Sequence, residues 1–263
     1  MRIIAGPCQH ESYEHSLEIA RECQRVCNMY GFDYYFKASF DKANRTSING
    51  KRGVGNSVDE SMNTFISDMK DLKKNIGVKV LTDVHERWQV GPLEKVVDVL
   101  QIPAFLCRQT DLIRAVCKGD CIINIKKGQF LAPWDVEGIL SKTEGAKEVW
   151  ITERGTSFGY NNLVVDFSGM EYCLRRYNVP FVYDATHSVQ KPSINGGSSG
   201  GDRTLVVPLL RAATALGVSN FFLEVHPDPD NAPSDGPNML KLDDFEEAVY
   251  NIAQYHYDPR NTG

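Results

Sequence analysis

Short apolar runs and helical patterns alternate along the chain. Eight runs are rich in Val, Ile and aromatic residues and do not alternate cleanly between apolar and polar positions. This pattern is typical of strands that are buried on both faces. The eight predicted strands cover residues 2–6, 33–39, 78–84, 97–103, 121–127, 148–154, 180–186 and 220–226.

Between these runs, apolar residues recur at the spacing of helices that bury one face. The pattern is clearest over residues 15–31, 58–77, 202–217 and 242–257. Gly31 is a stop signal for the first of these helices, and Pro208 is expected in the first turns of the third or at a bend in it.

A repeat of eight strands, each followed by a helix, predicts a parallel (β/α)8 TIM barrel. An open, doubly wound sheet is the alternative, but it gives no reason for so even a repeat. We find no linker or low-complexity segment, so we expect one domain over residues 1–263.

Composition narrows the class of protein. The chain carries a net charge of -5 and is 42% apolar, which argues against non-specific nucleic-acid binding and for a proper buried core. Its seven cysteines lack paired motifs, which suits a reducing compartment. No apolar stretch follows a basic start and none is long enough to span a bilayer, so we expect a soluble cytoplasmic protein.

Polar residues gather just beyond the predicted strands, where parallel barrels have their reactive face. One charged strand end is ordinary and can be a solvated surface cation, whereas a ring of them suits a site for charged ligands. Lys126 is the hardest of these residues to explain as a solvated surface cation, because it ends a predicted buried strand, where an unpaired charge is costly. The strand-end residues are Cys8, Lys37, Asp83, His85, Arg108, Gln109, Lys126, Arg154, His187, Glu224 and His226.

Four of the polar residues could form a metal site with sulfur, nitrogen and oxygen ligands, which suits Zn, Fe, Mn or Co. They are far apart in the sequence, so their spacing gives no support. On the residues alone, a buried Cys8 that acts as a small apolar side chain stays an open alternative. The four are Cys8, His187, Glu224 and Asp235.

Eight motifs at successive strand ends carry a family resemblance. They read AGPC, FKASFDKANRTS, LTDVHE, LQIPAFLCRQTDL, INIKKGQF, ERGTSFGYNNLVVD, YDATHSVQKP and EVHPDPDNAPSDGP. With these motifs the chain resembles the 3-deoxy-D-manno-octulosonate 8-phosphate synthases over almost its whole length. The sibling 3-deoxy-D-arabino-heptulosonate 7-phosphate synthases typically have Pro-Arg-Thr where this chain has Ala43-Asn44-Arg45-Thr46, and the Asn-Arg pair favours the octulosonate enzymes.

The resemblance implies a condensation of phosphoenolpyruvate with arabinose 5-phosphate that releases inorganic phosphate. It implies that Asn44 contacts the sugar hydroxyls, and that Arg45 and Thr46 bind the sugar phosphate. Members of the family form tetramers in which this pair reaches a neighbouring site. The residues implied for phosphoenolpyruvate are Lys37, Lys42, Arg108, Gln109, Lys126 and Arg154.

The family also divides into metal-dependent and metal-independent enzymes, and the latter carry Asn at the position of Cys8. The resemblance therefore implies a divalent metal held by the four ligands named above. His187 would also order the water or phosphate. Asp83 and His85 would relay protons or orient Lys126, with a purely supporting role as the equal alternative.

Two other functions stay open. The chain could use erythrose 4-phosphate, as the heptulosonate enzymes do, or it could be a catalytically silent barrel that binds sugar phosphates. A sialic-acid-type synthase is more remote, because those chains add a separate C-terminal domain.

Overall fold

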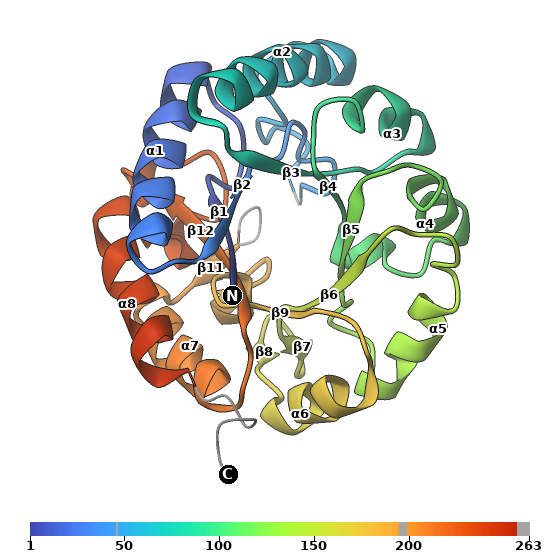
Figure 1. Ribbon diagram of the computed structural model, residues 1–263, viewed down its shortest axis with the longest axis vertical. Coiled ribbons are helices and arrows are strands. Elements are labelled where there is room, and N and C mark those ends of the chain that lie inside the picture. The colour runs from blue at the N-terminus through green and yellow to red at the C-terminus, as the bar shows by residue number, and fades with distance from the viewer. Residues whose placement is uncertain (46, 195–198, 257–263) are drawn as a thin grey trace.

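Eight parallel strands close into a barrel in the computed structural model, which describes residues 1–45, 47–194 and 199–256. Each strand pairs with the next in chain order, and β12 pairs back onto β1, with Gly6 opposite Glu224. This closure confirms the predicted TIM barrel and excludes the open sheet (Figure 1). The strands are β1 (Arg2–Gly6), β2 (Asp33–Lys37), β3 (Lys79–Asp83), β4 (Val99–Ile102), β5 (Ile122–Lys126), β6 (Val149–Glu153), β9 (Phe181–Asp184) and β12 (Asn220–His226).

Helices surround the barrel (Figure 1). The four helices with the clearest sequence pattern are present, with Pro208 in the first turn of α7. The intervening α3, α4 and α5 have only seven, seven and five residues, too few to show a helical period in the sequence. The helices are α1 (Tyr13–Met29), α2 (Val58–Ile76), α3 (Arg87–Leu93), α4 (Thr110–Val116), α5 (Val136–Leu140), α6 (Phe167–Arg176), α7 (Val206–Ala215) and α8 (Phe245–Tyr255).

The ends of the two long helices follow from local chemistry. The hydroxyls of Ser12 and Ser57 accept hydrogen bonds from backbone N–H groups in the first turns of α1 and α2. Gly77 ends α2 with φ 66°, a left-handed conformation that glycine adopts at no steric cost. Capping thus sets where the chain enters and leaves these helices.

One layer of large side chains fills the inside of the barrel. All eight strands contribute to it, and the rings of Tyr35 and Trp150 meet edge to face with centroids 5.2 Å apart. Phe222 belongs to this layer and lies directly under the ammonium of Lys126, 3.2 Å from nitrogen to ring centroid. The layer therefore forms an apolar floor beneath the polar strand ends. Its members are Ile4, Tyr35, Leu81, Val99, Ile122, Trp150, Val182 and Phe222.

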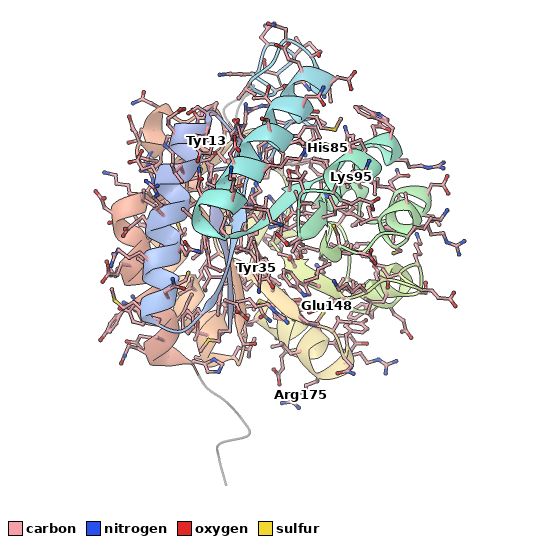
Figure 2. The ribbon with its side chains drawn as sticks, turned by 45° about the horizontal axis from the view of Figure 1, so that its top comes forward. Tyr13, Tyr35, His85, Lys95, Glu148 and Arg175 are labelled. Atoms are coloured by element: carbon pink, nitrogen blue, oxygen red, sulfur yellow. The ribbon has the colours of Figure 1, made fainter. Side chains whose placement is uncertain are left out.

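The loops at the carboxyl end of the barrel contain further short strands. β7 (Thr156–Ser157) pairs with β8 (Leu163–Val164), β10 (Gln190–Lys191) pairs with β11 (Gly200–Gly201), and β13 (Leu240–Lys241) extends the sheet beside β12. Figure 2 shows the side chains along the barrel, with His85 toward the end where strands finish and Glu148 toward the end where they start. Among the described helices, none has the length and apolar character required to cross a membrane.

We expect Trp150→Ala to lower the free energy of unfolding by about 3–5 kcal/mol, because it removes the largest side chain of the interior layer and leaves a cavity. Trp88→Ala is the matched control, since half of Trp88 is exposed on α3, and it should cost about 0.5 kcal/mol or less. Chemical denaturation measures both. Equal losses would show that the interior layer is not the core of the barrel.

Candidate active site

A cavity of about 490 Å³ opens at the carboxyl ends of the strands. Most sequence-predicted cations line it together with polar residues from the loops after β9 and β12. The polar and charged lining residues include Lys37, Lys42, Asn44, Arg45, Asp83, Gln101, Lys126, Gln129, Arg154, Asp184, His187, Gln190 and Asp235.

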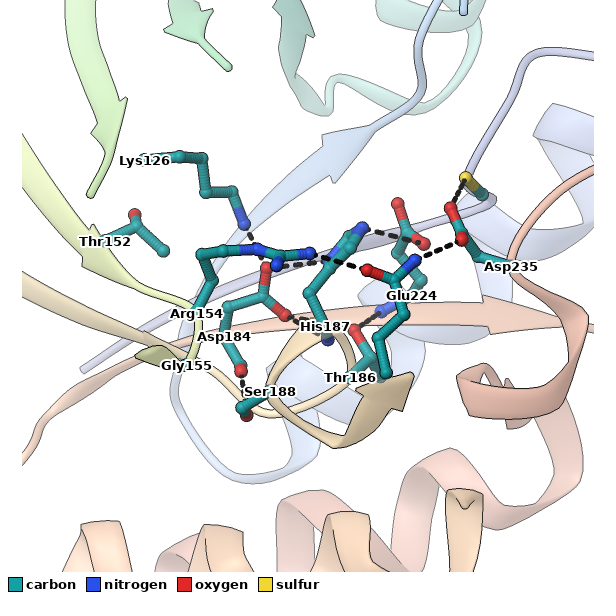
Figure 3. Close-up of polar contacts among 12 residues, drawn as sticks. Lys126, Thr152, Arg154, Gly155, Asp184, Thr186, His187, Ser188, Glu224 and Asp235 are labelled. Carbon is teal, nitrogen blue, oxygen red and sulfur yellow. Dashed lines mark hydrogen bonds and ion pairs between the residues drawn. The ribbon is translucent and has the colours of Figure 1, made fainter. Parts of the chain in front are cut away.

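Asp184, at the end of β9, holds two of the predicted site residues. Its Oδ2 atom accepts hydrogen bonds from Lys126 Nζ and, at 2.8 Å, from His187 Nδ1 (Figure 3). Burial raises the pKa of Asp184, but the positive charges of His187 and Lys126 outweigh it and leave the pKa below its usual range. Burial lowers the pKa of Lys126 to about 8. Asp184 is thus a buried anion that fixes a lysine able to exchange protons near neutral pH.

The bond from His187 Nδ1 to Asp184 turns the other ring nitrogen toward Glu224. His187 Nε2 lies 3.5 Å from Glu224 Oε2, and that carboxylate oxygen has no hydrogen-bond partner among the described residues. Burial raises the pKa of Glu224, but the charges of His187 and Lys37 outweigh it and lower the pKa. A charged, buried and unpartnered oxygen that faces an imidazole nitrogen is what a cation site requires.

Cys8 and Asp235 complete this group. Cys8 Sγ donates to Asp235 Oδ2 at 3.1 Å, and ligand atoms of Cys8, Glu224 and Asp235 all lie within 4.8 Å of one another. Burial and Glu224 raise the pKa of the Cys8 thiol, so an incoming ion would have to displace its proton. Three of the four predicted ligands are therefore gathered in one group, and His187 adjoins it at Glu224. Their sulfur, nitrogen and oxygen donors fit a borderline divalent ion.

A second group, Glu11, His15 and His226, also brings three possible ligand atoms within 4.8 Å of one another. Its hydrogen bonds fit a metal poorly. The backbone N–H of Asp228 donates to His226 Nδ1 at 2.9 Å, so the proton sits on Nε2, which donates to Glu11 Oε1 at 2.9 Å. A metal would need the lone pair that this arrangement blocks, and the Cys8 group remains the better site.

The predicted cations differ in how they are held. Lys37 Nζ donates to Glu224 Oε1 at 2.8 Å and to the carbonyl of Cys8 at 3.0 Å. Arg154 donates to Gln190 Oε1 at 2.8 Å, whereas its Nη1 has no partner in the described part of the chain. Arg45 donates to Gln9 Oε1 at 2.7 Å. Hydrogen bonds within the protein thus fix the positions of these cationic side chains, which keep further N–H donors for an anionic ligand.

A family model described as the DAHP synthetase I family matches residues 1–257. The chain belongs to this family. The chain is also 48% identical over 257 residues to the 2-dehydro-3-deoxyphosphooctonate aldolase of Bartonella tribocorum, covering 97% of this chain and 90% of that protein. Proteins of the same name from Rickettsia bellii and Rhodopseudomonas palustris are each 48% identical, over 96% and 97% of this chain and 90% and 88% of their own lengths.

Five described residues that were predicted for the site do not line the cavity. Among these, Cys8 and Glu224 belong to the metal group, and His85 pairs with Asp83. Arg108 and Gln109 lie beyond a 3-10 turn (Ala104–Leu106) that follows β4, with exposed side chains that are not among the described residues lining the cavity. Thr46 lies outside the described residues. Their predicted roles stay predictions.

Asp83 and His85 are paired with each other, at 3.1 Å between Oδ2 and Nε2. The ion-pair partner that the structure gives to Lys126 is Asp184 rather than either of them. The sequence pattern does not single out Asp184 or Gln190 as site residues, although both lie in the motif that contains His187. The available signal was a polar residue inside or just after a buried strand, where an unsatisfied group is costly.

We expect Cys8→Ala to weaken divalent-metal binding at least about 100-fold and to leave the fold intact. A direct ligand is lost, and this costs more than the loss of a residue that only hydrogen-bonds to a ligand. His15→Ala, which alters the second group, is the matched control and should keep one tightly bound ion per chain. Metal content after dialysis and circular dichroism measure the two effects. If Cys8→Ala retains its metal, or if His15→Ala loses it, the ion does not bind at the Cys8 group.

Proposed function

We propose that this protein condenses phosphoenolpyruvate with D-arabinose 5-phosphate and water, giving 3-deoxy-D-manno-octulosonate 8-phosphate and inorganic phosphate. The observation that carries the proposal is one cavity whose wall includes Lys37, Lys126 and Arg154 and also His187 and Asp235 of the proposed metal site. Lys42 and Arg45 line the same cavity. The names of the relatives, 2-dehydro-3-deoxyphosphooctonate aldolase, support the same acceptor.

The cations divide between two anionic substrates. We assign Lys37, Lys42, Lys126 and Arg154 to phosphoenolpyruvate, with Arg108 and Gln109 as further predicted contacts. Phosphate and carboxylate oxygens would then replace protein partners at groups such as Arg154 Nη1. We assign Asn44, Arg45 and Thr46 to arabinose 5-phosphate, so the two substrates meet above the apolar floor.

In the reaction, C3 of phosphoenolpyruvate attacks the sugar aldehyde, water adds at C2, and phosphate leaves with cleavage of its C–O bond. The buried cations orient the enol phosphate and stabilise charge on the leaving phosphate. Lys126 Nζ, with a pKa of about 8, suits a general acid or base close to the reacting atoms. Asp83 at the wall of the cavity and His85 paired behind it are proposed to relay protons, and His187 to order the water or phosphate.

We infer that Cys8, His187, Glu224 and Asp235 would hold a divalent ion, with Zn, Fe, Mn and Co as candidates. When bound, such an ion supplies Lewis-acid chemistry for an aldehyde oxygen or a water molecule. The chain's own contribution is to keep the two carboxylates charged and to turn His187 Nε2 toward them.

We also infer one catalytic domain over residues 1–263, because all eight strands or the loops after them contribute to this site. A homotetramer and a cytoplasmic location are further proposals that rest on the resemblance described above.

Erythrose 4-phosphate is the second candidate acceptor, since the family model is described by the DAHP synthetase name. The Asn44-Arg45 pair and the named relatives favour arabinose 5-phosphate.

We expect phosphate release from phosphoenolpyruvate with arabinose 5-phosphate at a kcat/KM at least about 100-fold above that with erythrose 4-phosphate, and loss of turnover in chelator. A phosphate-release assay with each acceptor, with and without chelator and re-added metal, measures this. Preference for erythrose 4-phosphate would establish the second candidate. Absence of turnover with both acceptors in metal-loaded protein would favour a silent binding barrel.

We expect Arg45→Ala to raise KM for arabinose 5-phosphate about 10- to 100-fold, because a charge-assisted contact to the sugar phosphate is lost, with little change in KM for phosphoenolpyruvate. Arg25→Ala is the control, because Arg25 pairs with Glu22 and Glu246 on the outer helices. Steady-state kinetics with each substrate varied separates the cases. Equal increases for both substrates in Arg45→Ala contradict the assignment.

A further inference from the structure

Gln190 connects a proposed phosphoenolpyruvate residue to a proposed metal ligand. It is the first residue of β10, is only 8% exposed and lines the cavity. Its Oε1 accepts from Arg154 at 2.8 Å, and its Nε2 donates to Asp235 Oδ1 at 2.6 Å. The two hydrogen bonds can be followed from Arg154 to Asp235 in Figure 3.

The chemistry of its neighbours allows the amide only one orientation. A guanidinium offers only donors and a carboxylate only acceptors, so a flipped amide would face donors with donors and acceptors with acceptors. A buried cation and a buried anion are therefore joined by a neutral group that cannot satisfy both in any other way. Movement of either ion changes the position preferred by the other.

Arg154 and Asp235 each use one atom for Gln190 and keep another atom for a ligand. Arg154 uses Nη2 for Gln190, whereas its buried Nη1 has no partner among the described residues and is available to an anion. Asp235 uses Oδ1 for Gln190, whereas its Oδ2 accepts from Cys8 at 3.1 Å in the proposed metal group. Asp235 has φ 55°, a conformation uncommon outside glycine that depends on its surroundings to persist.

We propose that Gln190 is a positioning residue that couples the binding of phosphoenolpyruvate at Arg154 to the binding of the metal at Asp235. The proposal rests on the proposed function. An anion on Nη1 fixes the guanidinium, which fixes the amide, and the amide holds the Asp235 carboxylate with Oδ2 toward Cys8. By thermodynamic linkage, each ligand must then tighten the other by the same factor.

The test measures binding rather than turnover, with Co²⁺ as the metal probe. The Co²⁺ dissociation constant is measured from thiolate-to-metal absorption without and with saturating phosphoenolpyruvate, and that of phosphoenolpyruvate by calorimetry without and with Co²⁺. In the unaltered chain we expect each ligand to tighten the other about 10-fold or more, within the range typical of coupled sites. In Gln190→Met, which keeps the volume and loses both hydrogen bonds, we expect this factor to fall about 10-fold.

Gln101→Met is the matched control. Gln101 is 5% exposed and lines the same cavity. Among the described residues, its side chain accepts a hydrogen bond from Asn124 and is hydrogen-bonded to neither Arg154 nor Asp235. We expect the coupling factor to be unchanged in this variant. Gln190→Glu is the second altered protein, because it keeps an acceptor for Arg154 while placing a carboxylate against Asp235. It should lose the coupling but bind phosphoenolpyruvate in metal-free protein within about 3-fold of the unaltered chain.

If folded Gln190→Met keeps the coupling factor of the unaltered chain, or if Gln101→Met loses as much coupling as Gln190→Met, the coupling proposal is wrong. Neither result would affect the proposed function. If circular dichroism shows that Gln190→Met does not fold, Gln190→Glu decides by the same measurement, and coupling retained there overturns the proposal. Failure of the unaltered chain to bind phosphoenolpyruvate at all would overturn the proposed function as well.

Discussion

The pairing of β1 with β12 is the constraint on which the site depends. It sets Gly6 opposite Glu224, so the loop after β1 brings Cys8 beside a carboxylate 216 positions later in the sequence. Gly6 also lies tightly against β2, the other neighbour of β1, because a side-chain carbon at position 6 would lie 2.1 Å from the carbonyl oxygen of Lys37. The same close approach lets Lys37 Nζ reach both Glu224 and the Cys8 carbonyl. Closing the barrel and building the metal group are therefore one structural event.

Two of the buried cations at the strand ends, Lys37 and Lys126, are held by anions of the protein itself. Lys37 pairs with Glu224, and Lys126 pairs with Asp184, in side chains that are almost fully buried. An isolated charge at such positions would be very costly, whereas a paired one is tolerable. Because Asp184 also accepts from His187, the anion that stabilises Lys126 also orients the imidazole of the metal group. The residues proposed for phosphoenolpyruvate and those proposed for the metal thus share a supporting carboxylate.

The sequence pattern predicts the barrel well, because buried parallel strands and amphipathic helices leave different periods. It predicts most of the site as well, since strand ends of a closed barrel converge: Lys37, Lys126, Arg154 and His187 all reach one cavity. It does not predict Asp184 or Gln190, whose importance comes from partners that only the folded chain supplies. It also cannot place Arg108, because the turn after β4 carries that residue six positions beyond the strand.

The unpartnered groups explain why a stable barrel keeps polar atoms that its own chain does not satisfy. Glu224 Oε2 and Arg154 Nη1 are buried and have no partner within the described ranges, and each such atom costs stability. They have opposite charge, and Arg154 lines the cavity while Glu224 lies 3.5 Å from His187 of the same lining, so a cation and an anion that bind together would satisfy both. A cation alone would leave the guanidinium nitrogen unpaired, and an anion alone would leave the carboxylate oxygen unpaired. This asymmetry favours a site that is complete only with both ligands present, which is consistent with the proposed binding of a metal ion beside an anionic substrate.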